Sequence, residues 1–324
     1  MTRAAAPPSA AAAAAPDSAA ADGTAPDGVA SGAAVPDAAA LLRDLVDQLQ
    51  VEPLERNLFR GRSVALVGER VFGGQVLGQA VMAAARTVEG RTLHSLHAYF
   101  LRPGDTRAPI VYDVERIRDG TSFTTRRVVA IQHGRPIFNF AASFQVPEDG
   151  VEHAEPMPRG AGPEGLRNET ELRAATIGQL PEAVRAALLR ERAIELRPLE
   201  PADLLPGGPR PPVSDTWMRA AGALPDDAVL HQAMLAYASD FGLLRTAMLP
   251  HGLHFLQPHL QVASLDHAMW FHRPFRMDDW LLYKTDSPSA SGARGFCRGS
   301  LYAHDGRLVA SVAQEGLMRV RGTD

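Results

Sequence analysis

Two segments of this chain show the same order of hydrophobic patterns, a helix followed by four extended runs. In the first segment, small and apolar residues from Gln75 to about Val88 predict a helix that lies close against another surface. Alternating apolar positions then predict strands, separated by turns at Pro103-Gly104, Asp119-Gly120 and Gly134. The runs cover residues 93–101, 109–117, 122–132 and 136–145. One helix followed by such a meander predicts an antiparallel sheet wrapped around a central helix.

The second segment repeats this order in the C-terminal third. A helix is predicted from His231 to about Met248, and the extended runs cover residues 260–275, 279–287, 293–306 and 307–319. The sequence AYFLRP at 98–103 matches MWFHRP at 269–274, and HGRPIFNFAA at 133–142 matches DGRLVASVAQ at 305–314. Two matches in the same order and at nearly the same offset indicate a duplicated unit.

These patterns divide the chain into four parts. Residues 1–38 are rich in Ala, Pro and Gly, so we expect a disordered tail, although Arg3 before an alanine run also fits a secretory signal interrupted by prolines. Asp37 is expected to cap a first helix. The first repeat covers residues 39–150 and the second covers residues 213–324. A Pro- and Glu-rich linker, 151–212, joins them and contains a predicted helix around residues 181–192.

Composition excludes several classes of function. The net charge is −4, from 33 basic and 37 acidic residues, so nothing favours nucleic acid or an anionic membrane as a partner. Lys284 is the only lysine and does not follow a glycine, which excludes a Walker phosphate loop. Cys297 is the only cysteine, which excludes an intrachain disulfide and suits the cytoplasm. No window approaches the roughly 20 apolar residues that span a membrane.

Asp240 lies within an otherwise apolar stretch, HQAMLAYASDFGLL. An ionised carboxylate in such a setting costs several kcal/mol or more unless it is hydrogen-bonded or paired. Asp240 is therefore either a satisfied structural acid or a functional one. Strand alternation places Gln314 on the same face as Val312 and Met318, and places Ser264 on the same face as Val262. Each alone fits a plain hydrogen-bonding role. Together they give an acid on the central helix and a hydroxyl and an amide on the strands that wrap this helix.

Several longer motifs carry a resemblance to a known family. They are FGGQVLGQA, LHSLHAYFLRPGD, DVERIRDGTSFTTRRVVAIQHGRPIF, YASDFGLL, HAMWFHRPF, SGARGF, DGRLVASVAQEG and LMR. With these motifs, the chain resembles the acyl-CoA thioesterase II family over essentially all of residues 40–321. The resemblance implies an α+β double-hotdog fold, hydrolysis of fatty acyl-CoA to free fatty acid and CoA, no metal or other cofactor, and assembly as a homodimer or homotetramer.

The resemblance also implies a set of catalytic residues that hold a water molecule. In this sequence they are Asp240, Ser264 and Gln314. The family commonly has Thr at the middle position, whereas Ser264 keeps the hydroxyl and lacks the methyl group that fixes the rotamer. Asp240 would orient and deprotonate the water, and Ser264 and Gln314 would hold it.

Two further groups of residues are candidates for binding the substrate. The glycine-rich helix start at Gly73, Gly74 and Gln75 offers backbone N–H groups for a developing oxyanion, although glycines that simply turn the chain explain it equally well. Arginine is the preferred phosphate partner, so the CoA phosphates are expected to meet one or more exposed arginines. The candidates for this contact are Arg102, Arg273 and Arg294.

Three alternatives stay open at this point. Asp240 could act as a nucleophile that forms a mixed anhydride. The fold could instead bind acyl-CoA or an acyl carrier without catalysis, or it could be a hotdog dehydratase, which would need a His and acid pair. Histidines at HxxH spacing, 94/97 and 251/254, lack an evident third ligand, so no metal is expected.

Overall fold

A computed structural model describes residues 37–66, 70–175, 178, 185, 189, 191–200, 208–255 and 257–321. Almost all of the predicted tail, and most of the helix predicted at 181–192, lie outside the described residues. The helices are α1 (Ala38–Leu49), α2 (Gly73–Ala85), α3 (Glu169–Ala174), α5 (Ala228–Ser239), α6 (Leu243–Met248) and the 3₁₀ turn η1 (Leu249–His251). The strands are β1 (Glu52–Glu55), β2 (Leu58–Gly61), β3 (Thr92–Phe100), β4 (Ile110–Asp119), β5 (Phe123–Gln132), β6 (Arg135–Gln145), β7 (Ile194–Pro198), β8 (Val213–Ala220), β9 (Leu260–Ser264), β10 (Asp266–Phe271), β11 (Leu281–Ser291), β12 (Arg294–Ala303) and β13 (Leu308–Val320).

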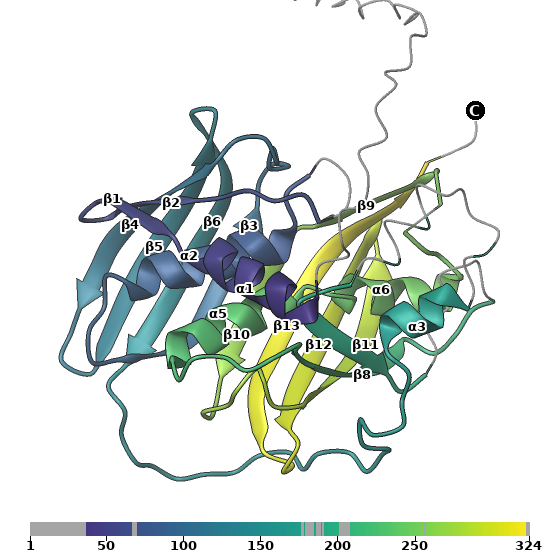
Figure 1. The fold of residues 1–324 in the computed structure, drawn as a ribbon. Coiled ribbons are helices and arrows are strands. Elements are labelled where there is room, and N and C mark those ends of the chain that lie inside the picture. The colour runs from purple at the N-terminus through teal and green to yellow at the C-terminus, as the bar shows by residue number, and fades with distance from the viewer. Residues whose placement is uncertain are drawn as a thin grey trace, which may run out of the picture. The chain divides into compact units, whose positions relative to one another are not determined.

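The strands form one antiparallel sheet with a palindromic order. Its path within the described residues is β1-β2-β4-β5-β6-β3-β10-β13-β12-β11-β8-β7, with β9 paired to β13 beside β10. The second half therefore repeats the first half in reverse, and each half carries its own helix, α2 or α5 (Figure 1). The two predicted repeats, each an antiparallel sheet around a helix, are confirmed.

Strands β3 and β10 join the two halves. Ala268 pairs with His97 at the centre of this ladder, and these two residues are equivalent in the sequence repeat, 171 positions apart (268 − 97). Met269 pairs with Leu96, and its equivalent Ala98 pairs with His267. A local two-fold axis therefore relates β3 to β10, so that residues of β3 have equivalents in β10.

Helices α2 and α5 pack against each other on one face of the sheet (Figure 1). Glycine permits this close approach: a Cβ on Gly78 would lie 2.9 Å from the carbonyl oxygen of Ala233, and one on Gly74 would overlap the carbonyl oxygen of Tyr237. Both helices are buried around most of their circumference. This explains why their sequences are apolar on every side.

The helix predicted from His231 to about Met248 is interrupted, so that prediction is wrong in its middle. Helix α5 ends at Ser239, Asp240 is its C-cap, and α6 begins at Leu243. Gly242 between them has a φ of 73°, a left-handed conformation that glycine adopts without strain. Asp240 therefore lies at a helix end, where its carboxylate leaves the helix surface, and not within a continuous helix.

Asp37 caps α1 as predicted, with its side chain accepting a hydrogen bond from the amide of Ala40. Strands β1, β7 and β8 were not predicted. Strand β7 pairs with β8, so part of the segment predicted as a linker adds an edge strand. Strand β7 alternates over only five residues, and β1 and β8 show no clear alternation, so pairing defines these strands.

The segment before β7 covers the outer face of the C-terminal half of the sheet. A second apolar cluster forms there from Trp217, Leu282 and Tyr302, and Met157, Leu166, Leu199, Trp280 and Leu308 pack against it. Trp280 is flanked by the guanidinium groups of Arg197 and Arg219, at 4.9 and 4.3 Å from the ring centroid. This cover has no counterpart among the described residues of the N-terminal half.

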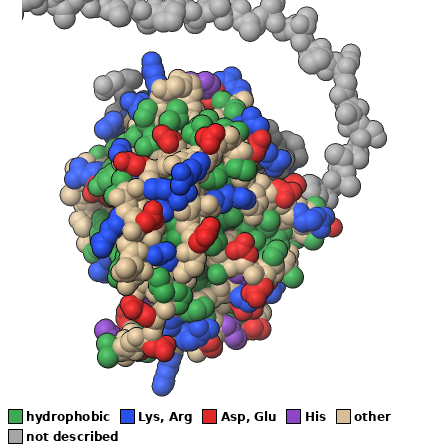
Figure 2. All heavy atoms as spheres, turned by 90° about the vertical axis from the view of Figure 1, so that its left-hand side faces the viewer, with side chains coloured by type: hydrophobic (Ala, Val, Ile, Leu, Met, Phe, Trp, Pro, Cys, Tyr) green, Lys and Arg blue, Asp and Glu red, His purple; other side chains and the backbone are tan. Residues whose placement is uncertain are grey.

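On the face drawn in Figure 2, acidic and basic side chains are interspersed. Exposed ion pairs on β1, β2, β4 and β5 include Arg60 with Glu52 and Arg127 with Glu115. Within the described residues, no helix combines the length and the apolar character needed to cross a membrane.

Candidate functional site

The structure brings Asp240, Ser264 and Gln314 together. Ser264 Oγ lies 3.3 Å from Asp240 Oδ1 and donates to it, and Gln314 Nε2 donates to Ser264 Oγ over 2.9 Å. The other carboxylate oxygen, Oδ2, accepts from the amide of Gly74 at 3.0 Å. The end of α5, the last residue of β9, the middle of β13 and the start of α2 thus meet at one carboxylate.

Strand geometry accounts for this meeting. Residues 312, 314, 316 and 318 of β13 are buried and residues 311, 313, 315 and 317 are partly exposed, which confirms the predicted inward face of Gln314. Strand β9 pairs with β13 so that Ser264 lies opposite Gly316. Ser264 and Gln314 are then neighbours on the face that carries the helices. The predicted inward direction of Ser264 is confirmed by its contact with Asp240.

Burial dominates the electrostatics of Asp240. The side chain is half-buried, and loss of hydration raises its pKa from 3.8 to about 6. Hydrogen bonds from Gln314, the Gly74 amide and Ser264 act in the opposite direction because they favour the charged form. Being at the end of α5, the carboxylate gains nothing from that helix's dipole, and its stabilisation comes from the start of α2 and from the strands.

The glycine-rich start of α2 faces Asp240, and its three residues differ in role. A Cβ on Gly73 would lie 2.7 Å from Asp240 Oδ2, so this position must stay small. The N–H of Gly74 is directed at Asp240. The amide of Gln75 donates to the carbonyl of Phe72, and its side chain is buried and bonded to Arg62 and Val64. Gln75 therefore secures the preceding loop, and only Gly73 and Gly74 present backbone toward the carboxylate.

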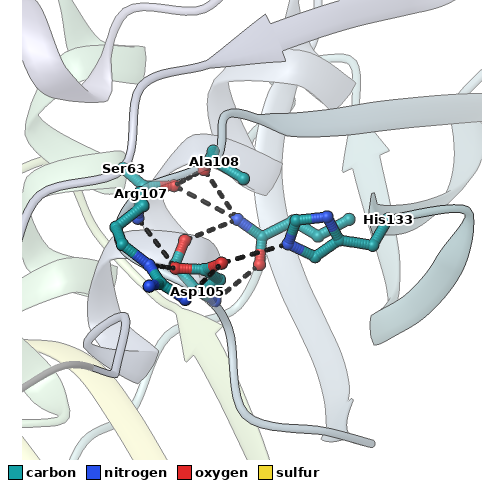
Figure 3. A network of polar contacts seen from close by, with 6 residues as sticks. Ser63, Asp105, Arg107, Ala108 and His133 are labelled. Atoms are coloured by element: carbon teal, nitrogen blue, oxygen red, sulfur yellow. Dashed lines mark hydrogen bonds and ion pairs between the residues drawn. The ribbon is translucent and has the colours of Figure 1, made fainter.

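A polar network around the buried side chain of Gln132 joins the loop that leads into α2 to the loop after β3. Gln132 lies at its centre: its amide donates to the carbonyls of Asp105 and Ala108 and contacts Ser63 (Figure 3). Asp105 pairs with Arg107 and His133, and the hydrogen bond from Arg107 helps to hold the pKa of Asp105 well below its usual range. Ser63 donates to Ala108, which ties the loop after β2 to the loop after β3. This network thereby holds the segment that leads from β2 into α2.

His267 is a polar residue of the site that the sequence patterns did not single out. It is fully buried on β10, with Nδ1 2.7 Å from Gln314 Oε1 and Nε2 2.9 Å from Ser239 Oγ. Burial lowers its pKa to about 4, so the ring is neutral near pH 7. The sequence did contain a sign that His267 points inward: it alternates with Met269 and Phe271 on the buried face of β10.

Aromatic side chains border the carboxylate. Phe72 stacks on Phe241 with ring centroids 4.8 Å apart, and Tyr237 meets both rings edge-on. Phe100 lies near the position that a Cβ of Gly73 would occupy. The guanidinium group of Arg192 lies 5.3 Å from the centroid of Phe241. Asp240 is thus bordered by an apolar wall on the side of α2.

The three selected arginines do not share one location. Arg294, on β12, pairs with Leu317 of β13, close to the Gly316–Ser264 pair. Its guanidinium is bound to Glu315 at 2.9 Å. Arg102 follows β3 at the end where Phe100 bonds to Leu265, so it also lies toward Ser264, and it donates to a carbonyl.

Arg273 follows the far end of β10. The extended chain from Ser264 to Phe271 spans seven residues, or roughly 20 Å, so Arg273 lies well away from the carboxylate. Its guanidinium also pairs with Glu152 at 3.2 Å. Arg102 and Arg294 therefore lie near the Ser264 end of the central strands, with Arg294 on the outer face beside Glu315 and Leu317, and Arg273 lies at the opposite end.

Within the part of the chain that the structure describes, no three His, Cys, Asp or Glu side chains cluster in a way that could hold a metal ion. His94 of the first HxxH pair contacts the hydroxyl of Ser143 instead.

Comparisons with known proteins decide the family. The model of the acyl-CoA thioesterase family matches residues 188–317, and that of the acyl-CoA thioesterase N-terminal domain matches residues 62–145. The chain is 41% identical over 280 residues to acyl-CoA thioesterase 2 of Haemophilus influenzae, covering 86% of this chain and 98% of that protein. It belongs to the acyl-CoA thioesterase II family.

Further relatives of this family are similar over comparable lengths. Human acyl-coenzyme A thioesterase 8 is 42% identical over 286 residues, which cover 84% of this chain and 88% of the human protein. The crystal structure of an acyl-CoA thioesterase II from Mycobacterium marinum superposes with a TM-score of 0.70 at 42% identity, covering 87% of this chain and 99% of that one. A hot dog fold protein from Alicyclobacillus acidocaldarius has a TM-score of 0.68 at 18% identity, covering 86% and 99%. The predicted double-hotdog α+β fold is confirmed.

Proposed function

We propose that this member of the acyl-CoA thioesterase II family hydrolyses fatty acyl-CoA thioesters to free fatty acid and CoA. The observation that carries the proposal is the half-buried carboxylate of Asp240, held by Gly74 and Ser264 and raised in pKa to about 6. A carboxylate with this pKa is ionised at neutral pH and still basic enough to take a proton. The names of the family's relatives supply the substrate class.

In this mechanism Asp240 is the general base. A water bound beside Oδ1 gives up a proton to the carboxylate as its oxygen attacks the thioester carbonyl. Ser264 and Gln314 hold the water and the carboxylate in position, with Gln314 acting on Ser264 over 2.9 Å. The tetrahedral intermediate then collapses, the C–S bond breaks and the CoA thiolate leaves with a proton returned from Asp240.

The developing oxyanion would be stabilised at the start of α2. Gly73 and Gly74 present backbone to the carboxylate, and the positive end of the helix dipole lies there. The N–H of Gly74 donates to Asp240 Oδ2, so it would serve the oxyanion only by leaving that carboxylate oxygen as the carbonyl oxygen arrives. The apolar wall of Phe72, Tyr237 and Phe241 would face the acyl group.

Binding of the CoA phosphates is assigned within the same proposal to Arg102, which lies toward Ser264. Arg273 lies at the far end of β10 and would not serve this site. Arg294 lies on the outer face of the sheet and is paired with Glu315, so it is not included.

Release of CoA thiol tests the proposal directly. Purified protein is offered saturated acyl-CoAs from short to long chain, and binding of a non-hydrolysable thioether analogue is measured in parallel. Turnover of one or more chain lengths supports the enzyme. Binding without any thiol release would favour the second candidate, a non-catalytic acyl-CoA or acyl-carrier binding module.

The nucleophilic route, in which Asp240 forms a mixed anhydride, is tested by mass. Acid quenching during steady-state turnover would trap an acyl adduct on the chain if that route operated. We expect no adduct, because Ser264 and Gln314 are placed to hold a water rather than to stabilise an acylated carboxylate.

We propose the same domain organisation as from the sequence: a tail at 1–38, repeats at 39–150 and 213–324, and a connecting segment at 151–212 that includes β7.

Assembly into a homodimer or homotetramer is supported by exposed aromatic side chains on the outer face of the central strands, Tyr99 and Trp270. The buried free thiol of Cys297 is compatible with the proposed cytoplasmic location. Sedimentation of the purified chain tests the assembly.

A further inference from the structure

His267 connects the proposed site to the interior of the protein. Both of its ring nitrogens have partners: Nδ1 lies 2.7 Å from Gln314 Oε1, and Nε2 lies 2.9 Å from Ser239 Oγ. The side chains of His267 and Ser239 are fully buried, and that of Gln314 is 1% exposed. No solvent is needed to satisfy these groups.

The orientation of the Gln314 amide sets the donor and acceptor roles of His267. Gln314 Nε2 donates to Ser264, so Oε1 faces His267 and can only accept. Nδ1 of His267 must then carry the proton. The ring is neutral because burial lowers its pKa to about 4, so Nε2 is bare and accepts from the hydroxyl of Ser239, whose single proton could otherwise go to the carbonyl oxygen of Ala236, also at 2.9 Å.

The result is a chain of donors directed at one carboxylate. The hydroxyl of Ser239 donates to His267, His267 donates to Gln314, Gln314 donates to Ser264, and Ser264 donates to Asp240. If the amide of Gln314 were reversed, its oxygen would face Ser264 and draw the Ser264 hydroxyl proton away from Asp240. The carboxylate would then lose one of its donors.

The N-terminal repeat shows that packing alone does not require histidine here. The equivalent of His267 is Leu96, 171 positions earlier, and both side chains are fully buried. The equivalent of Gln314 in the aligned segments 133–142 and 305–314 is Ala142. The first repeat thus fills the same two places with apolar side chains, so the imidazole answers a polar need found only beside Asp240.

We propose that His267 is a positioning residue, which selects the orientation of the Gln314 amide and through it the direction of the Ser264 hydroxyl. The proposal rests on the proposed thioesterase function. His267 touches neither Asp240 nor the water, and it acts only through Gln314. Ser239 accommodates the ring tautomer that has its proton on Nδ1, because its hydroxyl can donate to Nε2 in place of the Ala236 carbonyl.

Two nearly isosteric variants separate positioning from packing. Asn at position 267 places an N–H near the site of Nδ1, whereas Leu copies the first repeat and offers no donor. We expect H267N to keep kcat within about threefold of the wild type, and H267L to lose roughly tenfold or more in kcat with little change in KM, the scale of one hydrogen bond. Equal kcat values for H267L and the wild type would overturn the inference.

The pH profile adds a readout that a structural role would not move. Donation from Ser264 and Gln314 lowers the pKa of Asp240, so its loss in H267L should shift the acid limb of kcat/KM to higher pH. Tyr283, which donates to the Ser239 carbonyl, and Cys297, which lies opposite Gln314 in the sheet, have pKa values raised by burial, well above 10 for Tyr283 and to about 11 for Cys297. Burial also raises the pKa of Asp266, which precedes His267, so the shift is taken as the difference between H267L and the wild type, both of which contain Asp266. An unchanged acid limb in an H267L enzyme with reduced kcat would favour simple damage.

A third measurement does not depend on the folding of any apolar variant. In ¹⁵N spectra of the wild type at pH 7, assigned by comparison with H267N, His267 should be neutral with its proton on Nδ1. A proton on Nε2 would overturn the inference. Wild-type protein that releases no CoA would overturn the proposed function and this inference with it, whereas wild-type turnover with an unaffected H267L would overturn this inference alone.

Discussion

The amide nitrogen of Gly74 lies 3.0 Å from Oδ2 of Asp240, although 166 residues separate them in the chain. This hydrogen bond joins the start of α2 in the first repeat to the end of α5 in the second. Each repeat alone would hold half of the site: one supplies a helix start with glycines, and the other supplies an acid, a hydroxyl and an amide. The duplicated fold therefore needs both repeats for a single site.

Substituting Gly74 tests this junction. A Cβ at Gly74 would overlap the carbonyl of Tyr237 and the ring of Phe72, so we expect Gly74→Ala to lower the free energy of unfolding by roughly 1–3 kcal/mol and to reduce activity. Gly150→Ala is the matched control, because nothing lies within 4 Å of that position. Chemical denaturation of both variants measures the difference. Equal stability for the two would contradict the tight approach of α2 to α5.

The activity of the wild type should depend on a single ionisation in the acid range. Asp240 must be ionised to accept a proton, and its pKa is about 6. We expect kcat/KM to fall tenfold per pH unit as the pH drops below about 6, and to be level above it until another group titrates. Thiol release measured at several pH values with a fixed acyl-CoA provides the profile. A profile that stayed flat down to pH 4 would argue against Asp240 as the base.

The same pKa predicts that Asp240 destabilises the fold at neutral pH. The folded pKa of about 6 lies above the ordinary value of 3.8, so the folded chain binds this proton more tightly than the unfolded chain does. The ionisation of Asp240 therefore does not reduce the free energy of unfolding below about pH 4, and it reduces this free energy as the pH rises through 6, by roughly 3 kcal/mol in total. We expect Asp240→Asn to unfold at a higher temperature than the wild type at pH 8, with the difference closing toward pH 4. A less stable variant at pH 8 would show that the carboxylate is more fully compensated than its burial suggests.

The hydroxyl of Ser264 should matter more than its exact side chain. Ser264 donates to Asp240 and accepts from Gln314, so Ser264→Ala removes both contacts and should lower kcat by roughly 10- to 100-fold. Ser264→Thr keeps the hydroxyl and restricts its rotamer, so we expect it to retain or exceed wild-type activity. Steady-state kinetics of the two variants decide this. Similar losses in both would mean that the space around Ser264, rather than its hydroxyl, limits the reaction.

The arginines offer a test of where CoA lies. Arg102→Gln should raise KM for acyl-CoA with little change in kcat, whereas Arg273→Gln, at the far end of β10, should leave both unchanged. Both arginines donate to backbone carbonyls, so the pair is matched in local structure. An increase in KM confined to Arg273→Gln would place the CoA phosphates at the opposite end of the central strands.

Strand periodicity and the internal repeat were sufficient to predict the two meanders and the inward face of Gln314. They failed where non-local contacts decide the outcome. The sequence from 231 to 248 has apolar residues spread over all sides of a helix, so its periodicity gave no sign of the break at Asp240 and Gly242. Strands β1 and β7 are short and are defined by their partners β2 and β8, so local pattern did not mark them.

For the site as well, local patterns and family motifs pointed to some residues, and non-local contacts decided the others. The residues named by the family resemblance met at one carboxylate, but His267 did not stand out, since a histidine on a strand is ordinarily packed and bonded. Its importance depends on the direction of four consecutive hydrogen bonds, which only the three-dimensional arrangement reveals. Likewise, Gln75 belongs to the helix start in sequence but is directed into the preceding loop.

In the proposed reaction, Asp240 removes a proton from the attacking water. The most direct measurement compares CoA release by the wild type and by Asp240→Asn at pH 8, at saturating acyl-CoA, with affinity for a thioether analogue measured in both. We predict that kcat falls by about 10²- to 10⁴-fold in the variant, while the affinity changes by less than about threefold. A variant that releases CoA within tenfold of the wild-type rate would contradict the account.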